Sequence, residues 1–117
     1  MKKILISIFI ISIFGFISCK DYEAQITVEN KVHNVQISGI KYGDFYLSGY
    51  LIPGESSTTT IRVEDKNDFP MENVIEFYME ANGNKVFLKT KEKFKIDLEG
   101  NITITITDST EVINPML

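Results

Sequence analysis

Side chains that could do covalent chemistry are scarce in this 117-residue chain, which has one cysteine, Cys19, and one histidine, His33. Nucleophilic catalysis needs a nucleophile, a base and an orienting group held together, and a zinc site needs several histidine or cysteine ligands. Because His33 stands beside Asn34 near a predicted turn, we expect a surface imidazole. We therefore expect no catalytic residues, no metal, no cofactor and no enzyme activity.

Carboxylates are more abundant, with 16 Asp and Glu residues against 12 Lys and Arg residues. The run 64–68 offers oxygen atoms that calcium could use. It lacks the spacing and the glycine of a helix-loop-helix calcium site, and Lys66 opposes a cation, so a solvated loop is the simpler interpretation. Scattered acids also produce accidental carboxylate pairs, which makes a hydrolase the least favoured hypothesis.

Aromatic side chains form the more informative pattern. By strand parity, four of them lie on the face opposite the core: Tyr46, Tyr50, Tyr78 and Phe87. Flat rings on a solvated sheet face often contact a sugar ring or a protein, because their large area binds at low entropic cost. The alternative is that a second sheet or a loop covers this face. The four residues are a candidate binding face.

The elements that would position these rings are short strands, because apolar residues alternate with period two from Ala24 onward. The clearest example is Ile102, Ile104 and Ile106 between threonines. We expect eight strands, near residues 24–29, 34–41, 45–52, 57–64, 74–81, 85–90, 93–98 and 102–107. This pattern predicts an all-β fold, a two-sheet antiparallel β-sandwich of about 7–8 short strands.

The chain lacks the cysteine pair and the tryptophan of antibody domains. An immunoglobulin-like sandwich without those residues, a prealbumin-like sandwich and a small barrel stay open.

One turn predicts a complete strand register. Asn82-Gly83 as a type I′ turn needs positive φ at both residues. The core-face pairs are then Met79 with Val86 and Phe77 with Leu88, and the outer pairs are Glu80 with Lys85, Glu76 with Lys89 and Tyr78 with Phe87. Moving the loop to Gly83-Asn84 would lose both charge pairs, so we favour the first register.

Other glycines and prolines predict the remaining breaks. Glu99-Gly100-Asn101 is expected to be a three-residue turn between strands 93–98 and 102–107, with Gly100 or Asn101 left-handed. The other expected breaks are turns at Gly43-Asp44 and Pro53-Gly54, a loop from Asp65 to Pro70, and a bulge at Gly39.

The N-terminal residues have the pattern of an export signal. Lys2 and Lys3 precede an apolar run, residues 4–17, and the small residue Ser18 precedes Cys19. The run is shorter than the roughly 17 to 25 residues of a membrane-spanning helix, so we expect cleavage rather than retention.

The tetrad Phe16-Ile17-Ser18-Cys19 resembles the lipobox of bacterial lipoproteins, with phenylalanine where leucine is usual. The resemblance implies a diacylglycerol on Cys19 and removal of residues 1–18. The chain is similar in this respect to small cell-surface lipoproteins of the Bacteroidota type. In those proteins a charged tract like Lys20–Glu23 resembles the signal for the outer face of the outer membrane, and an ordinary tether is the alternative.

These expectations divide the chain into a signal peptide (1–18), a lipidated tether (19–23) and a sandwich domain (24–117). Removing Lys2 and Lys3 leaves a formal charge of −6, two below the −4 of the whole chain. This charge gives no reason to bind nucleic acid, so membrane attachment would come from the lipid. We expect a monomer without disulfides, located in the bacterial cell envelope.

Two tracts resemble glycosylation signals. Asp108-Ser109-Thr110 resembles the O-glycosylation acceptor of Bacteroidota exported proteins, in which Ser109 would carry the glycan, and a strand end explains the tract equally well. Asn101-Ile102-Thr103 has the form of an N-glycosylation acceptor, but a turn is the simpler interpretation.

The favoured function is a membrane-anchored, non-enzymatic binding or accessory module for a protein or glycan partner. The alternative is a protease inhibitor that displays a loop such as Ile52–Ser57 on a rigid scaffold.

Overall fold

The computed structural model of the protein describes residues 21–115, which are mostly β-strands. In chain order the elements are β1 (Tyr22–Lys31), β2 (Gln36–Tyr42), β3 (Phe45–Leu51), β4 (Ser56–Val63), the 3-10 turn η1 (Lys66–Asp68), β5 (Met71–Asn73), β6 (Ile75–Ala81), β7 (Asn84–Thr90), β8 (Phe94–Ile96), β9 (Asn101–Thr107) and β10 (Val112–Ile113). Within residues 21–115, no helix is long and apolar enough to cross a membrane. The predicted signal peptide and Cys19 lie outside the described residues.

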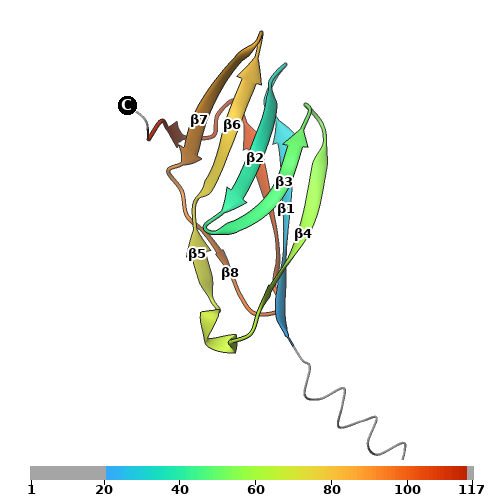
Figure 1. Ribbon diagram of the computed structural model, residues 1–117, viewed down its shortest axis with the longest axis vertical. Coiled ribbons are helices and arrows are strands. Elements are labelled where there is room, and N and C mark those ends of the chain that lie inside the picture. Colours follow the sequence, from blue (N-terminus) through green and yellow to red (C-terminus); the bar gives the residue numbers. More distant parts are fainter. Residues whose placement is uncertain (1–20, 116–117) are drawn as a thin grey trace, which may run out of the picture.

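Two sheets face each other across the core (Figure 1). The five-stranded sheet has the order β10-β7-β6-β2-β3 and lies in front of the three-stranded sheet, β4-β1-β9, in this view. A two-stranded ribbon, β5-β8, continues below them. The all-β sandwich is thereby confirmed. One pairing differs from the expected antiparallel pattern, because β1 and β9 are parallel.

The core follows the predicted alternation. In β9, Ile104 and Ile106 are buried, whereas Thr103 and Thr105 are exposed. The same alternation places Ile26 and other apolar residues of β1 against the five-stranded sheet. Each fully buried isoleucine stabilises the fold by about 1.5 to 3 kcal/mol relative to an exposed one. Packing of alternate strand residues is thus what holds the two sheets together.

The hairpin β6–β7 has the predicted register, and all five predicted pairs are present. Asn82 and Gly83 have φ values of 52° and 78°, as a type I′ turn requires. One detail of the prediction is wrong, because Val86 is 42 % exposed instead of buried. The tip of the hairpin extends past the three-stranded sheet, so Val86 has no opposite layer to pack against (Figure 1).

The predicted turn at residues 99–101 does not join a hairpin. β8 pairs with β5, and β9 pairs with β1, so the chain crosses between sheets here. Glu99 takes the left-handed conformation, with φ 60°, instead of Gly100 or Asn101. The crossing is held by β1, because the Glu99 N–H donates to the Glu23 carbonyl at 2.8 Å. Leu98 is consequently 38 % exposed and not part of a core strand.

The other predicted breaks are confirmed. Gly43 has φ 58° in the turn between β2 and β3, and Gly54 has φ 90° between β3 and β4. The pairing of β2 with both of its neighbours shifts near Gly39, which is the predicted bulge. The short strands β5 and β10 were not predicted, and β1 begins two residues before the expected start of the sandwich.

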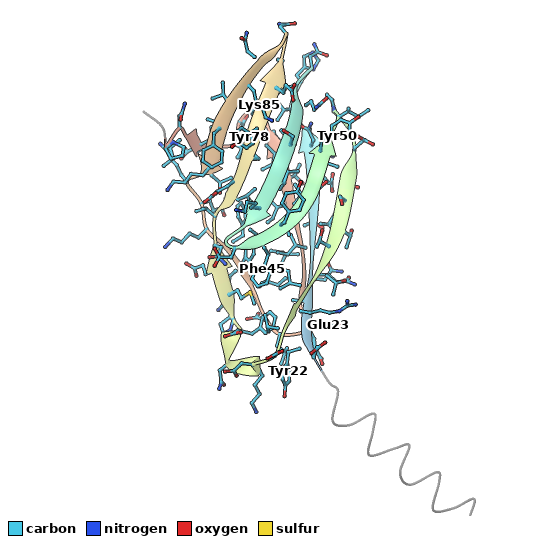
Figure 2. All side chains as sticks on the ribbon, in the orientation of Figure 1. Tyr22, Glu23, Phe45, Tyr50, Tyr78 and Lys85 are labelled. Carbon is cyan, nitrogen blue, oxygen red and sulfur yellow. The ribbon has the colours of Figure 1, made fainter. Side chains whose placement is uncertain are left out.

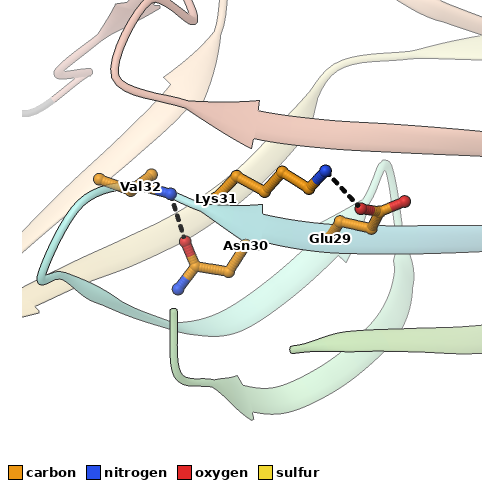
Figure 3. A network of polar contacts seen from close by, with 4 residues as sticks. All are labelled: Glu29, Asn30, Lys31 and Val32. Carbon is orange, nitrogen blue, oxygen red and sulfur yellow. Dashed lines mark hydrogen bonds and ion pairs between the residues drawn. The ribbon is translucent and has the colours of Figure 1, made fainter. Parts of the chain in front are cut away.

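The buried side chain of Asn30 joins three segments of the chain, and Figure 3 shows its bond to the backbone N–H of Val32. The Asn30 side chain donates to the carbonyl oxygens of Val35 and Leu51 at 2.8 and 2.9 Å, and it accepts from the Val32 N–H at 3.0 Å. The Asn30 carbonyl also accepts from the Gly54 N–H at 2.7 Å. This side chain therefore fixes the β1–β2 and β3–β4 connections against each other.

Candidate binding face

The register of the five-stranded sheet brings the predicted aromatic residues of three strands into one line. Phe87 on β7 lies opposite Tyr78 on β6, Tyr78 lies opposite Ser38 on β2, and Ser38 lies opposite Tyr50 on β3. Directly opposite residues share a sheet face, so these four side chains form a row across four strands. We call it the aromatic row. At a strand spacing of about 4.8 Å it is about 14 Å long.

The aromatic row lies on the outer face, away from the core. Tyr50 is 56 % exposed, Tyr78 is 36 % exposed and Phe87 is half-buried. Tyr46 lies beside the row on β3 and is 60 % exposed. The alternative, in which a sheet or loop covers these side chains, does not hold within residues 21–115. Their role in binding stays a prediction.

Tyr78 is held in place from three directions. Its ring centroid is 5.0 Å from that of Phe87, with the planes tilted by 43°. The ammonium nitrogen of Lys85 is 4.7 Å from the centroid of the Tyr78 ring. A Cβ atom at Gly39 would lie 3.1 Å from the Tyr78 ring, so glycine there lets the ring lean over β2. The ring is thus oriented before any ligand arrives.

Ser38 is the member of the row that the sequence did not reveal. Its side chain is short and stands between Tyr78 and Tyr50, and the residue is only 9 % exposed. The Ser38 hydroxyl has no hydrogen-bond partner among the described residues. A buried hydroxyl without a partner costs about 1 to 3 kcal/mol. The pairing of β2 with β3 and with the distant β6 shows that Ser38 belongs to the row.

Polar residues border the aromatic row on both sides. The polar row on the side of the β6–β7 turn consists of Lys85, Glu80 and Gln36. The polar row on the opposite side consists of Lys89, Glu76, Lys41 and Tyr46. Within the first row, the Gln36 amide is 3.4 Å from a Glu80 carboxylate oxygen. The two polar rows together hold three lysines and two glutamates, so they carry little net charge.

The other residues considered from the sequence do not gather into a site. His33 is exposed, and its backbone N–H donates to the Asp108 carboxylate at 2.8 Å. In the 64–68 run, the Asp65 carboxylate accepts from the Asn67 N–H at 2.9 Å and so begins η1. The described residues contain no cluster of three or more His, Cys, Asp or Glu side chains that could hold a metal ion.

The two tracts that resemble glycosylation signals lie at the surface. Ser109 is exposed in the turn after β9, where its N–H donates to the Thr107 hydroxyl at 3.1 Å. This position suits modification and also explains the tract as a turn, so O-glycosylation of Ser109 stays a prediction. Asn101 begins β9, with its amide 3.5 Å from the Gln25 side chain.

Chemically, the outer face of the five-stranded sheet offers aromatic surface, one unpartnered hydroxyl and charges of both signs. Such a face is suited to binding, because its rings and polar groups can contact a ligand together. Comparison with protein-family models, with curated proteins and with solved structures finds no significant match to this chain.

Proposed function

We propose that this protein is a non-enzymatic binding module, held at a bacterial cell envelope by a lipid on Cys19, and that the outer face of the five-stranded sheet binds its partner. The observation that carries the proposal is the aromatic row. Tyrosines on paired strands bind with a large area and lose little conformational entropy. Exposed rings gathered on one face are typical of an interaction surface.

The positions of Tyr22 and of the aromatic row on the sandwich support binding at a distance from the membrane. Tyr22 lies at the end of the sandwich opposite Lys85, while Tyr50 and Tyr78 lie in the half nearer Lys85 (Figure 2). A lipid on Cys19, three residues before Tyr22, would attach the sandwich by the Tyr22 end. The aromatic row would then stand away from the membrane. Together with the Lys20–Glu23 tract, this favours an outer membrane lipoprotein that faces the cell exterior.

The proposal is tested by photo-crosslinking in intact cells. A photoreactive phenylalanine analogue is placed at position 50 or at position 78 of the full chain. A third variant carries it at position 98, because Leu98 is also exposed but lies away from the aromatic row. We expect adducts, of protein or of glycan, from positions 50 and 78 and not from position 98. Equal labelling at all three positions, or none at any, would contradict the proposal.

Protease inhibition has no supporting observation in the fold. The loop Ile52–Ser57 is a closed turn, in which the Glu55 N–H donates to the Ile52 carbonyl at 3.0 Å. The Glu55 carboxylate also accepts from the Ile52 N–H at 2.9 Å. The loop therefore offers no extended segment for a protease cleft, and we retain the binding module as the proposed function.

A further inference from the structure

We propose that the ligand of the aromatic row is a neutral glycan chain, lying across the strands along the line from Tyr50 to Phe87. This inference rests on the proposed function and names the ligand class of the same face. Sugar rings present C–H groups on their faces and hydroxyl groups at their edges. An aromatic ring attracts the C–H groups through the negative face of its π system.

The shape of the face favours a linear ligand over a folded protein. The aromatic row is about 14 Å long, three strand spacings, but only one residue wide. On β6 and β7, charged residues follow two positions away on either side, about 7 Å from the row. A standard protein interface buries about 800 Å² on each partner around a dry, weakly charged centre. A narrow apolar strip between two polar rows matches a single glycan chain better.

The polar rows supply partners for sugar hydroxyls. The Gln36 amide and the Glu80 and Glu76 carboxylates can accept from hydroxyl groups, and Lys41 can donate to them. The charges of the two polar rows nearly cancel, because the rows together contain three lysines and two glutamates. A polyanionic chain would gain little at such a surface, so the charge pattern favours a neutral glycan.

Ser38 is the second observation that points to a ligand. Its hydroxyl lies in the middle of the row, more than nine-tenths buried, without a partner among the described residues. Tyr50, its neighbour on β3, is more than half exposed, so its ring is free to shift. A sugar hydroxyl that enters beside Tyr50 would complete the missing hydrogen bond of Ser38.

Lys85 is the group that the ligand must displace. Its ammonium lies over the Tyr78 ring in the free protein. A cation–π contact at an exposed site is among the weaker ones, and the ammonium regains water when it leaves. The Tyr78 ring is therefore accessible at small cost.

The first experiment is an array of neutral and acidic oligosaccharides probed with the full chain in detergent micelles. Affinities for the best glycan are then measured by tyrosine fluorescence, which is usable because the chain has no tryptophan. We expect at least one neutral glycan to bind. Tyr50→Ser should weaken this binding by about 10-fold or more, the loss typical of one stacked ring. The control Leu98→Ser, at an exposed apolar position outside the row, should bind as the wild type does.

Ser38→Ala provides a second, independent readout. Removing the unpartnered hydroxyl should leave thermal stability unchanged or raised, while it weakens glycan binding by about 3- to 10-fold, the value of one neutral hydrogen bond. A residue with a merely structural role would not combine these two effects. If Ser38→Ala left glycan binding unchanged, the role of Ser38 in binding would be excluded.

The outcomes separate this inference from the proposed function. Binding of no neutral glycan, binding of acidic glycans alone, or binding that Tyr50→Ser leaves unchanged would overturn the glycan inference. If position 50 nevertheless forms a protein adduct in cells, the binding module stands and only its ligand class is wrong. If the array and the crosslinking at positions 50 and 78 are both negative, both proposals fail.

Discussion

Tyr42 joins the five-stranded sheet to the β5-β8 ribbon through a single buried hydroxyl. The Tyr42 hydroxyl donates to the Phe94 carbonyl oxygen at 2.6 Å, with the Met71 carbonyl oxygen at 3.2 Å sharing the same proton. Tyr42 is fully buried, so no water replaces this donor. Deleting the hydroxyl leaves carbonyl oxygens without their partner, which typically costs about 1 to 3 kcal/mol.

We therefore expect Tyr42→Phe to lower the free energy of unfolding by about 1 to 2 kcal/mol at neutral pH. Urea denaturation followed by circular dichroism measures this change. The matched control is Tyr50→Phe, which removes a hydroxyl from an exposed ring and should change stability by less than about 0.5 kcal/mol. Equal effects of the two substitutions would show that the Tyr42 hydroxyl is not structural.

The same side chain predicts a pH dependence. Burial raises the pKa of Tyr42 above its ordinary value of 10.0, and this effect outweighs hydrogen bonds with Asn73 that lower the pKa. A raised pKa means that the folded state favours the neutral phenol. Its stabilising contribution is complete below the unfolded pKa of about 10 and is lost as pH rises through the folded pKa. Above about pH 10, the wild type should lose stability more steeply than Tyr42→Phe. Parallel slopes in urea denaturation would contradict this.

The third prediction at the residue scale concerns Asn30. Asn30→Ala removes the hydrogen-bond partners of two carbonyls and one N–H, and two of these three bonds are buried. We expect a loss of about 2 to 4 kcal/mol in the free energy of unfolding, because several buried backbone groups lose their bonds together. Asn101→Ala is the control, since that amide is exposed. A loss below about 1 kcal/mol for Asn30→Ala would mean that water or a rearranged loop replaces the side chain.

At the scale of elements, the crossing from β8 to β9 contains two adjacent residues with different constraints. Glu99 is constrained by its φ angle, and Gly100 is constrained by the space around it. Glu99 has φ 60°, a conformation in which a side chain costs about 1 kcal/mol or more. Gly100 lacks a positive φ, but a Cβ there would lie 2.8 Å from the Asp97 carbonyl oxygen. Position 100 therefore needs glycine because there is no space for a Cβ atom. At position 99, replacing Glu99 with glycine would relieve the backbone strain.

Substitutions at these two positions should therefore have opposite signs. Glu99→Gly should stabilise the fold by about 0.5 to 1 kcal/mol, whereas Gly100→Ala should destabilise it by at least about 1 kcal/mol. Thermal unfolding of both variants measures the difference. Gly49→Ala is the control, because a Cβ at Gly49 meets only the Tyr46 hydroxyl, at an ordinary 3.7 Å. Destabilisation by both Glu99→Gly and Gly100→Ala would contradict this interpretation of the crossing.

The β6–β7 and β8–β9 segments show which pairings a sequence can specify. The β6–β7 register was predictable because Asn82-Gly83 and two opposite charge pairs give the same answer locally. The β8–β9 segment has equally regular alternation, yet its strands pair with β5 and β1. The partners of β9 lie some 75 residues earlier in the chain, and no turn residue specifies such a pairing.

The candidate binding face was also predictable where it depends on local sequence, and not where it depends on the pairing of distant strands. Strand parity placed Tyr46, Tyr50, Tyr78 and Phe87 outside the core. The pairing of Tyr78 with Phe87 followed from the local turn. That Tyr50 belongs to the same row depends on β2 lying between β3 and β6, and this arrangement also adds Ser38.

For the whole molecule, the strand that follows the proposed tether and the proposed binding face belong to the same sandwich. β1 begins next to the tether and runs through the middle of the three-stranded sheet, paired with both β4 and β9. β1 is therefore held on both edges and is not a loose strand at the start of the sandwich. An anchor at this end leaves the aromatic row free to meet a partner.

The last prediction concerns this anchor. Cys19→Ala removes the chain's one thiol without touching any described strand, so we expect the sandwich to fold while fatty-acid labelling and membrane association are lost. Metabolic labelling and fractionation of cells measure both effects, with Ser109→Ala as a control that should stay lipidated. Protease treatment of intact cells then separates the faces of the membrane. Digestion of wild type alongside a known surface protein supports the outer face, and full protection excludes it. Unchanged labelling in Cys19→Ala would remove the lipid anchor from the proposed function.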